Sequence, residues 1–226
     1  MKLIMVVLLL VTSVSYSKTE ILFEANYNLK WGMMTIGKVK RSLTKDNDTY
    51  IFESVATPQK LARLFTKGIF EKSVFKFNKN EIVPISYEFK QTGRTKKFIT
   101  HNFKNGVLTI SKPKKLVVKS ILPNTVDYLS TQVVLMNGLA KGQKDFSLAM
   151  YEDSAKPDIY KLSKKAKVKM KVKAGSFDTI LIEKTNDLKK GKFVLWCAPK
   201  LNYIPVKIML TNKLGNVFTM ELLSIK

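Results

Sequence analysis

The sequence predicts a mainly β protein, built as a single curved antiparallel sheet or an open or half barrel with two short-to-medium helices. Stretches in which apolar and polar residues alternate recur along most of the chain, and such alternation is typical of half-buried strands. The connections between them are short and rich in turn residues, as in Asn78-Lys79-Asn80 and Lys104-Asn105-Gly106, which favours an antiparallel meander. Only two segments show a helical period, so helices are a minor part of this fold.

The first strand is predicted at residues 21–30, where alternate residues, among them Phe23 and Tyr27, share one apolar face. A second strand is predicted at 33–43, and Gly37 inside it indicates a bulge or a close approach of another backbone. Further strands are predicted at 50–55, 69–77, 82–91, 96–103, 107–111, 116–121, 145–151, 159–162, 165–174, 177–184, 192–197, 203–211 and 216–223.

A short helix is predicted at residues 58–67. Thr57-Pro58 has the pattern of an N-cap followed by proline at the first helical position. Leu61, Leu64 and Phe65 then form one apolar stripe, and Gly68 would end the helix.

A longer helix is predicted at residues 124–140. Asn124, Thr125 or Asp127 can serve as its N-cap, and Gly138 or Gly142 would end it. The apolar positions that follow the helical period are Val126, Leu129, Val133, Met136 and Ala140.

Residues 196–208 predict a strand, a rigid corner and a second strand. Pro199 ends the first ladder, and Pro205 is tolerated only near a strand start or on an edge. Large aromatic residues lie on both sides of this corner. We interpret the segment as an anchor of the fold, not as a catalytic motif.

Residues 1–17 have the pattern of a secretory signal peptide. Lys2 precedes an apolar run that is too short to span a bilayer, and Ser15-Tyr16-Ser17 is a small-x-small cleavage site. An N-terminal membrane anchor is the alternative, and the lack of a cysteine after the apolar run argues against a lipid anchor. We expect a single β-rich domain, residues 18–226, in the periplasm after cleavage near Ser17.

The chain is strongly basic, with 40 Lys and Arg residues against 17 Asp and Glu and a formal net charge of +23. Such a surface attracts polyanions in a salt-dependent way. In the cell envelope these are anionic membrane or glycolipid surfaces, and nucleic acid is not expected. Arginine occurs only at positions 41, 63 and 94, which indicates a diffuse field more than a site-specific phosphate contact. A biased codon composition is the alternative explanation.

Lysine alternates with apolar residues along residues 164–174. Side chains alternate between the two faces of a strand, so these lysines would line one face over roughly 26 Å. They are candidates for contact with an anionic surface. A solvent-facing or edge strand that lysine keeps soluble is the alternative. The candidate residues are Lys165, Lys167, Lys169, Lys171 and Lys173.

Residues capable of catalysis are few. His101 is the only histidine, so a multi-histidine metal site is excluded. Cys197 is the only cysteine, which excludes an internal disulfide, and its strand pattern favours a buried, unreactive thiol. The chain has no nucleophile elbow, no P-loop and no dinucleotide-binding motif. We therefore expect no catalytic residues, no metal and no cofactor.

Several motifs occur in a characteristic order along the chain. They are Tyr27-x-x-x-Trp31-Gly32 with Gly37, Ile82-Val83-Pro84-x-x-Tyr87, Asp127-Tyr128-Leu129-Ser130, and Trp196-x-x-Pro199-x-x-Asn202-Tyr203-x-Pro205-Val206. In their order and spacing, the chain resembles the bacterial exported family catalogued as domain of unknown function 3108, over essentially the whole mature chain. The resemblance implies a β-rich periplasmic protein with a strongly curved antiparallel sheet, similar in style to the lipoprotein-carrier proteins. It brings no established activity and no catalytic residues.

Four aromatic residues, Tyr27, Trp31, Trp196 and Tyr203, are candidates to line a ligand cavity, with core packing as the alternative. Our hypothesis is an exported, non-catalytic protein that binds an apolar or lipid-like ligand while its lysine faces contact anionic envelope surfaces. The alternative is an envelope scaffolding protein that meets a protein or glycan partner. A hydrolase that uses His101 or converging carboxylates is less favoured.

Overall fold

The computed structural model describes residues 19–226 except 65, 80, 95, 114, 152–155 and 187–190. The helical elements are α1 Tyr128–Ala140 and the 3-10 helices η1 Lys60–Leu64 and η3 Pro199–Leu201. The strands before α1 are β1 Glu20–Trp31, β2 Met34–Asp46, β3 Thr49–Pro58, β4 Thr66–Asn78, β5 Glu81–Gly93, β6 Lys97–Lys104, β7 Val107–Lys112, β8 Lys115–Ser120 and β9 Thr125–Val126. The strands after it are β10 Asp145–Met150, β11 Asp158–Val172, β12 Gly175–Lys184, β13 Lys192–Ala198, β14 Ile204–Thr211 and β15 Val217–Ile225.

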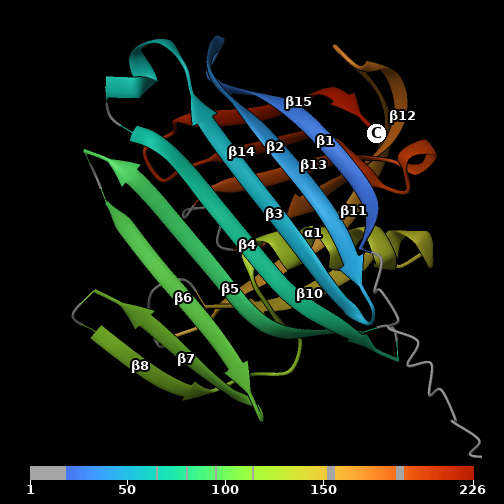
Figure 1. Ribbon diagram of the computed structural model, residues 1–226. Coiled ribbons are helices and arrows are strands. Elements are labelled where there is room, and N and C mark those ends of the chain that lie inside the picture. Colours follow the sequence, from blue (N-terminus) through green and yellow to red (C-terminus); the bar gives the residue numbers. More distant parts are fainter. Residues whose placement is uncertain are drawn as a thin grey trace, which may run out of the picture.

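In the described part of the chain, fifteen strands form one sheet in the order β8-β7-β6-β5-β4-β3-β2-β1-β15-β14-β13-β12-β11-β10-β9 (Figure 1). Every pair of neighbours is antiparallel except β9 and β10. The first and last strands are neighbours in the middle of the sheet, where Tyr27 lies opposite Leu222. This single mostly antiparallel sheet confirms the predicted fold class, while the predicted signal peptide lies outside the described residues.

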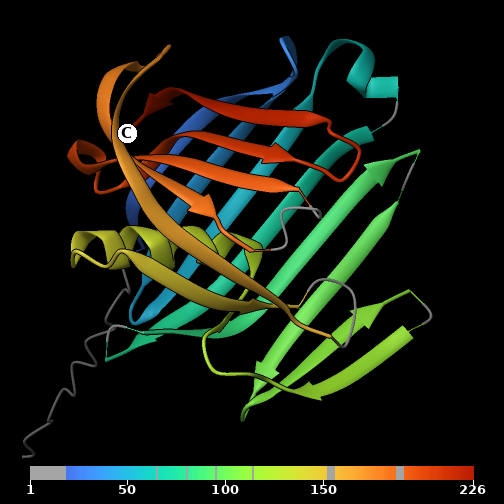
Figure 2. The same ribbon diagram turned by 180° about the vertical axis from the view of Figure 1, so that it is seen from behind.

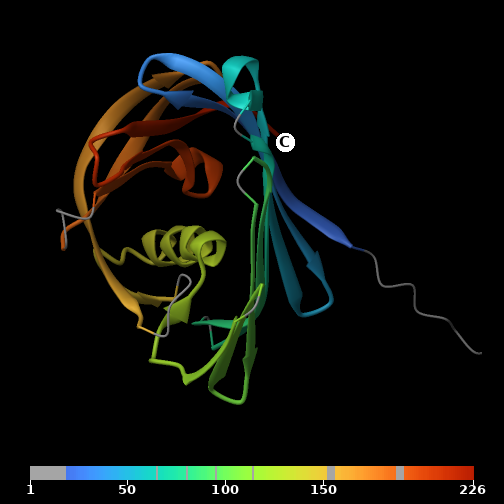
Figure 3. The same cartoon turned by 90° about the vertical axis from the view of Figure 1, so that its left-hand side faces the viewer.

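The sheet curls around α1. The end-on view in Figure 3 shows the helix inside the curve, and Figure 2 shows it lying across strands from the first half of the chain. α1 contacts β3, β4 and β5 on one side and β10 on the other. The helix therefore fills part of the concave side and joins the two halves of the sheet.

The largest core cluster lies on the concave side of the first strands. Tyr27, Phe52 and Phe75 are fully buried there, together with Leu129 of α1 and Leu222 of β15. Phe23, Ala25 and Tyr27 of β1 are buried as predicted. Successive side chains of a strand point to opposite faces, so these alternate residues share the face that packs in the core.

A second cluster lies between α1 and the later strands, around Leu135, Phe146 and Ile182. Cys197 is fully buried in it, and burial raises the pKa of its thiol to about 12. This agrees with the predicted buried thiol. A third, smaller cluster packs Tyr151, just after β10, against Leu108 of β7, which brings the two ends of the sheet together.

The predicted helix at residues 58–67 is wrong. Thr57 and Pro58 extend β3 and lie opposite Lys38 and Gly37, and the Gln59 N–H donates to the Ile36 carbonyl at 2.7 Å. Because β4 begins at Thr66, only the short 3-10 helix η1 fits between the strands. A proline without an N–H is tolerated at the end of a strand as well as at the start of a helix.

Gly37 has the role that the sequence predicted. A Cβ at this position would lie 2.7 Å from the Thr57 carbonyl oxygen. The pairing of β1 and β2 also shifts register beside Gly37, between Leu29 and Lys30. The glycine thus permits both a bulge and a close approach of β3.

Candidate functional site

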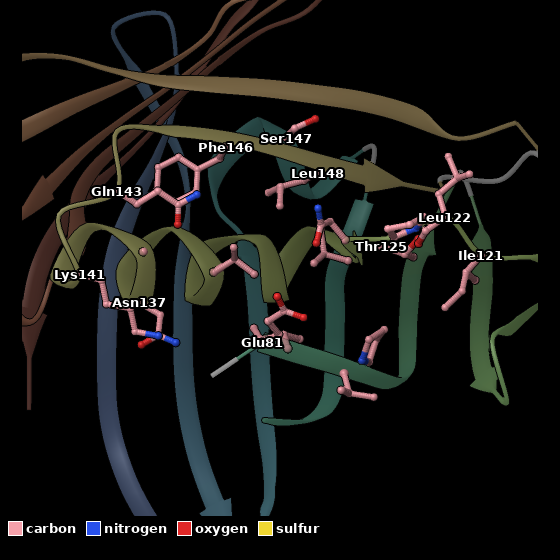
Figure 4. Close-up of a pocket in the computed structure, with 18 residues that line it drawn as sticks. Glu81, Ile121, Leu122, Thr125, Asn137, Lys141, Gln143, Phe146, Ser147 and Leu148 are labelled. Atoms are coloured by element: carbon pink, nitrogen blue, oxygen red, sulfur yellow. The ribbon is translucent and has the colours of Figure 1, made fainter. Parts of the chain in front are cut away.

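A groove of about 670 Å³ opens between α1, the start of β5 and β10 (Figure 4). Its walls combine residues 81–84 with residues from 121–148, about forty positions later in the sequence. The residues that line it are Glu81, Ile82, Val83, Pro84, Ile121, Leu122, Pro123, Asn124, Thr125, Val126, Val134, Asn137, Gly138, Lys141, Gln143, Phe146, Ser147 and Leu148.

The wall contributed by β5 depends on Pro84. The β4–β5 pairing places Pro84 opposite Phe75 and Ser86 opposite Val74, so one residue of β5 is extra at this point. Such a bulge accommodates a residue that has no N–H for the ladder and bends the strand. The first residues of β5, including Val83, are in this way directed along the groove.

The floor of the groove is the contact between α1 and β10. Gly138 of α1 faces the ring of Phe146, and a Cβ at position 138 would collide with that ring and with the Gln143 side chain. Glycine thus lets the helix approach β10 closely. Phe146 is 4% exposed and belongs both to the second core cluster and to the groove.

The two ends of the groove differ in chemistry. Asn137, Lys141 and Gln143 gather at one end, near the end of α1, while Ile121 and Leu122 lie at the other beside Thr125, and Glu81 lies between the two ends (Figure 4). The groove volume falls within the roughly 300–1,000 Å³ of small-molecule sites, and such sites combine apolar walls with a few polar groups. This arrangement suits an elongated molecule with one polar end.

Asp127 holds the start of α1, beside the groove. Its Oδ1 accepts hydrogen bonds from the backbone N–H groups of Leu129 and Ser130, both at 2.9 Å, and the Ser73 hydroxyl donates to its Oδ2 at 2.6 Å. The Asp127 N–H donates to the Ser130 hydroxyl, which completes a capping box. Asp127 is one of the three predicted caps, and its bond to Ser73 ties the helix to β4.

The Asp127 carboxyl is 2% exposed. Burial raises its pKa to about 6, although the hydrogen bonds from Ser130 and Ser73 act in the opposite direction. Desolvation disfavours the charged form, and the donors favour it. This carboxyl therefore changes protonation state at mildly acidic pH.

None of the four predicted aromatic residues lines the groove or the other described pockets. Tyr27 is fully buried, and its hydroxyl donates to the Pro205 carbonyl at 3.0 Å, so it pins β1 to β14. Trp31 is 49% exposed at the end of β1 and stacks on Phe218. Strand parity predicted the burial of Tyr27, but Trp31 has the same parity and is exposed, after a register shift between Leu29 and Lys30.

The other two aromatic residues lie on either side of the corner that follows β13, with Trp196 near the end of β13 and Tyr203 just before β14. Trp196 is half-buried, with the Lys207 ammonium 5.5 Å from the centre of its ring. Tyr203 follows η3 with φ +63 and packs against the second core cluster. The structure therefore places Trp196 and Tyr203 at the predicted corner and does not bring them to a ligand cavity with Tyr27 and Trp31.

The five candidate lysines, Lys165, Lys167, Lys169, Lys171 and Lys173, are all exposed. All but Lys173 lie in β11, which joins the two strands predicted at 159–162 and 165–174. β10 pairs only with Asp158–Ser163 of β11, so along the lysine segment the only paired strand in the described residues is β12. This exposed strand edge is compatible with both interpretations of the lysines.

Sequence reasoning missed two charged side chains on the concave side. Arg41 lies between the buried Val39 and Leu43 of β2, and its Nη1 donates to the Gln132 side-chain oxygen of α1 at 2.6 Å. Glu71 of β4 accepts a hydrogen bond from the Tyr87 hydroxyl at 2.7 Å. A charged residue with the strand parity of core residues is the signal that could have found them.

His101 lies on β6 with its side chain buried, 3% exposed. Its ring is 5.4 Å from the ring of Tyr87. Across the described residues, no group of three or more His, Cys, Asp or Glu side chains could hold a metal ion. No described helix is long and apolar enough to cross a membrane.

Comparison with known proteins agrees with this architecture. The family model described as Protein of unknown function (DUF3108) matches residues 26–223. The chain belongs to the DUF3108 family. No curated protein matches this DUF3108 chain. It is similar to a solved structure, the beta-barrel-like protein of domain of unknown function DUF1849 from Brucella abortus, with a TM-score of 0.58 and 9% identity over 90% of this chain and 96% of that one. At this identity the likeness shows the fold alone.

Proposed function

We propose that this protein is an exported, non-catalytic envelope protein that binds a lipid-like amphiphile in the groove under α1. The observation that carries the proposal is the groove of about 670 Å³, which is lined by many apolar side chains and has Asn137, Lys141 and Gln143 gathered at one end. The apolar chain of the ligand lies toward Ile121 and Leu122, and its polar head lies toward Lys141. Burial of a hydrocarbon chain against such walls contributes roughly 0.8 kcal/mol for each CH₂ group.

The rim of the groove supports this proposal. Val83 is 44% exposed and Leu122 is 42% exposed, and both line the groove. Exposed apolar side chains that surround a concave site are typical of ligand-binding surfaces. The pattern of an export signal at residues 1–17 is the basis for placing the protein in the periplasm.

The test compares binding of a fluorescent fatty-acid analogue by the wild type and by a Val83→Asn, Leu122→Asn variant. Two apolar contacts are lost, and about 1.4 kcal/mol corresponds to a tenfold change in affinity. We expect the variant to bind at least tenfold more weakly. The matched control is Leu116→Asn with Val118→Asn on β8, which are 65% and 56% exposed and line no described pocket.

Two results would remove the proposal. One is equal binding by the groove variant and the wild type. The other is the absence of any copurifying ligand in native mass spectra of protein taken directly from membranes, together with no binding of the analogue after delipidation.

The lysine strand supplies the proposed contact with anionic envelope surfaces. We expect a Lys167→Gln, Lys169→Gln, Lys171→Gln variant to sediment less with anionic liposomes, most visibly at low salt, because the attraction is screened. The unfolding free energy should change little, since these side chains are exposed. The control removes the same charge at the exposed Lys104, Lys115 and Lys119. Equal losses in both variants would assign the binding to net charge instead of to this strand.

A further inference from the structure

A second pocket, of about 230 Å³, lies on the concave side against β4, β5 and β6. It shares no lining residue with the groove under α1. Three tyrosines line it: Tyr87 of β5, Tyr128 at the start of α1, and Tyr151 after β10. Tyr87 and Tyr151 are each 4% exposed, while Tyr128 is 41% exposed at the rim. The pocket is thus small and largely aromatic, and Glu71, Phe89, Lys97, Ile99 and His101 complete its lining.

Glu71 brings a carboxylate into this aromatic pocket. Its Oε1 accepts a hydrogen bond from the Tyr87 hydroxyl at 2.7 Å, and burial together with this carboxylate raises the pKa of the Tyr87 hydroxyl. Among the described residues, no basic side chain forms an ion pair with Glu71, in a chain that has 40 Lys and Arg residues and 17 Asp and Glu. Lys97 also lines the pocket, and its Nζ lies 5.7 Å from the ring centre of Phe89.

A neighbouring carboxylate behaves differently. Glu53 of β3 pairs with Lys72 at 3.2 Å, and the β3–β4 register places these two residues opposite each other. Glu71 lies one position before Lys72 and therefore on the other face of β4. Lys72 thus pairs with Glu53 on one face of the sheet, while Glu71 on the concave face lines the pocket.

A pocket that combines aromatic rings with a carboxylate favours cationic ligands. The faces of aromatic rings carry partial negative charge and attract cations, most strongly where water is excluded. A carboxylate at the same place adds a direct counter-ion. The volume is below the roughly 300–1,000 Å³ of drug-sized sites, so it suits a small head group.

We propose that this pocket binds a small organic ammonium group, with Glu71 as its counter-ion and the rings of Tyr87, Tyr128 and Tyr151 as its walls. The ammonium group belongs either to a free compound or to the head group of a lipid, because the recognised chemistry is the same. This site is independent of the proposed groove under α1.

The test is calorimetric titration of the folded protein with choline chloride at constant ionic strength. The wild type is expected to show saturable binding, and Glu71→Gln is expected to bind at least tenfold more weakly. Glu53→Gln, which removes the same charge from β3, should bind like the wild type. Circular dichroism and the Tm of each variant confirm that it is folded.

A Tyr87→Phe variant tests whether Glu71 serves a ligand or only the hydrogen bond from Tyr87. It keeps the ring but removes the hydroxyl that donates to Glu71, so choline binding is expected to be equal or stronger. Lys97→Met removes a competing cation and should also bind choline more tightly.

Binding to lipid vesicles shows whether the ammonium group belongs to a lipid head group or to a free compound. Sedimentation with phosphatidylcholine vesicles that depends on Glu71 indicates a lipid head group, and choline binding without it indicates a free compound. No saturable choline binding by the wild type, or equal binding by Glu71→Gln, would overturn the proposal.

Discussion

Replacing Asp127 with alanine is expected to lower the free energy of unfolding by about 3 kcal/mol. The substitution removes the N-cap of α1, which typically contributes about 1 kcal/mol. It also leaves the Ser73 hydroxyl and the N–H groups of Leu129 and Ser130 without their acceptor in a buried place, and an unsatisfied buried donor costs about 1–3 kcal/mol. Urea unfolding followed by circular dichroism measures the change.

The matched control for this prediction is Asp145→Ala. Asp145 is exposed and accepts a hydrogen bond from Ser163 at 2.6 Å, so its loss is expected to cost less than about 1 kcal/mol. A loss at Asp127 no larger than at Asp145 would contradict the role given to the buried cap. Because α1 forms one side of the groove, the Asp127→Ala variant should also bind the fatty-acid analogue more weakly.

The same residue predicts a pH dependence. The pKa of Asp127 is about 6 in the folded protein, above its ordinary value of 3.8, so the native state binds more protons than the unfolded state between these values. Stability therefore falls as pH rises through this window. An Asp127→Asn variant does not titrate there, and relative to it the wild type is expected to lose roughly 2 kcal/mol between pH 4 and pH 6, since one pKa unit corresponds to about 1.4 kcal/mol and the titration is incomplete at both ends of this window.

Comparison with Asp127→Asn cancels the opposing contributions of other carboxyls. Lysine partners lower the pKa of Glu24 and Asp48, and these groups make stability rise with pH in both proteins alike. The quantity to measure is the difference between the two unfolding free energies at each pH. If the wild type instead gains stability relative to Asp127→Asn from pH 4 to pH 6, the hydrogen bonds that lower the pKa of Asp127 outweigh the burial that raises it.

Replacing Phe146 with alanine is expected to cost about 3–5 kcal/mol of stability, the range for deletion of a buried phenylalanine. Phe146 is 4% exposed and packs in the second core cluster with Leu135, Leu139 and Leu148. Its ring also lies against Gly138, where the helix has no side chain to fill the space left behind. Chemical denaturation measures the loss.

Phe98 provides the control, because it has the same side chain but is 40% exposed on β6. Phe98→Ala is expected to cost less than about 1 kcal/mol. Since the Phe146 deletion widens the groove instead of blocking it, the folded variant should still bind the fatty-acid analogue. Equal losses for the two phenylalanines would show that the contact between α1 and β10 is not a main source of stability.

Much of the fold is visible in the sequence because strand geometry is local. The alternation around Tyr27 predicts its burial, and the turn at Asn105-Gly106 lies where it was predicted, with positive φ at both residues. Asp127 could be named as one of three possible caps. Each of these inferences depends on residues only a few positions apart.

The segment after β3 shows where local reasoning fails. Thr57-Pro58 suits either a helix start or a strand end, and the choice depends on Gly37, which allows the backbone of β3 to come close. That contact joins residues about twenty positions apart, so a local pattern cannot reveal it. The four aromatic residues line none of the described pockets. Tyr27 illustrates a similar reason, since its hydroxyl donates to the carbonyl of Pro205, in a strand from the other end of the chain.

Local periodicity and the order of the motifs predicted most of the strands, the buried thiol, the family and the main helix from Tyr128 onward. They did not show that Thr125–Val126 form a strand beside β10, because that pairing joins distant residues. The tertiary structure alone decided the two pockets. The pairing of β1 with β15 and the curl of the sheet around α1 bring Val83, Leu122 and Phe146 to one groove. The same curl encloses Glu71 with Tyr151. A concave site depends on how distant strands meet, and strand periodicity carries no information about that meeting.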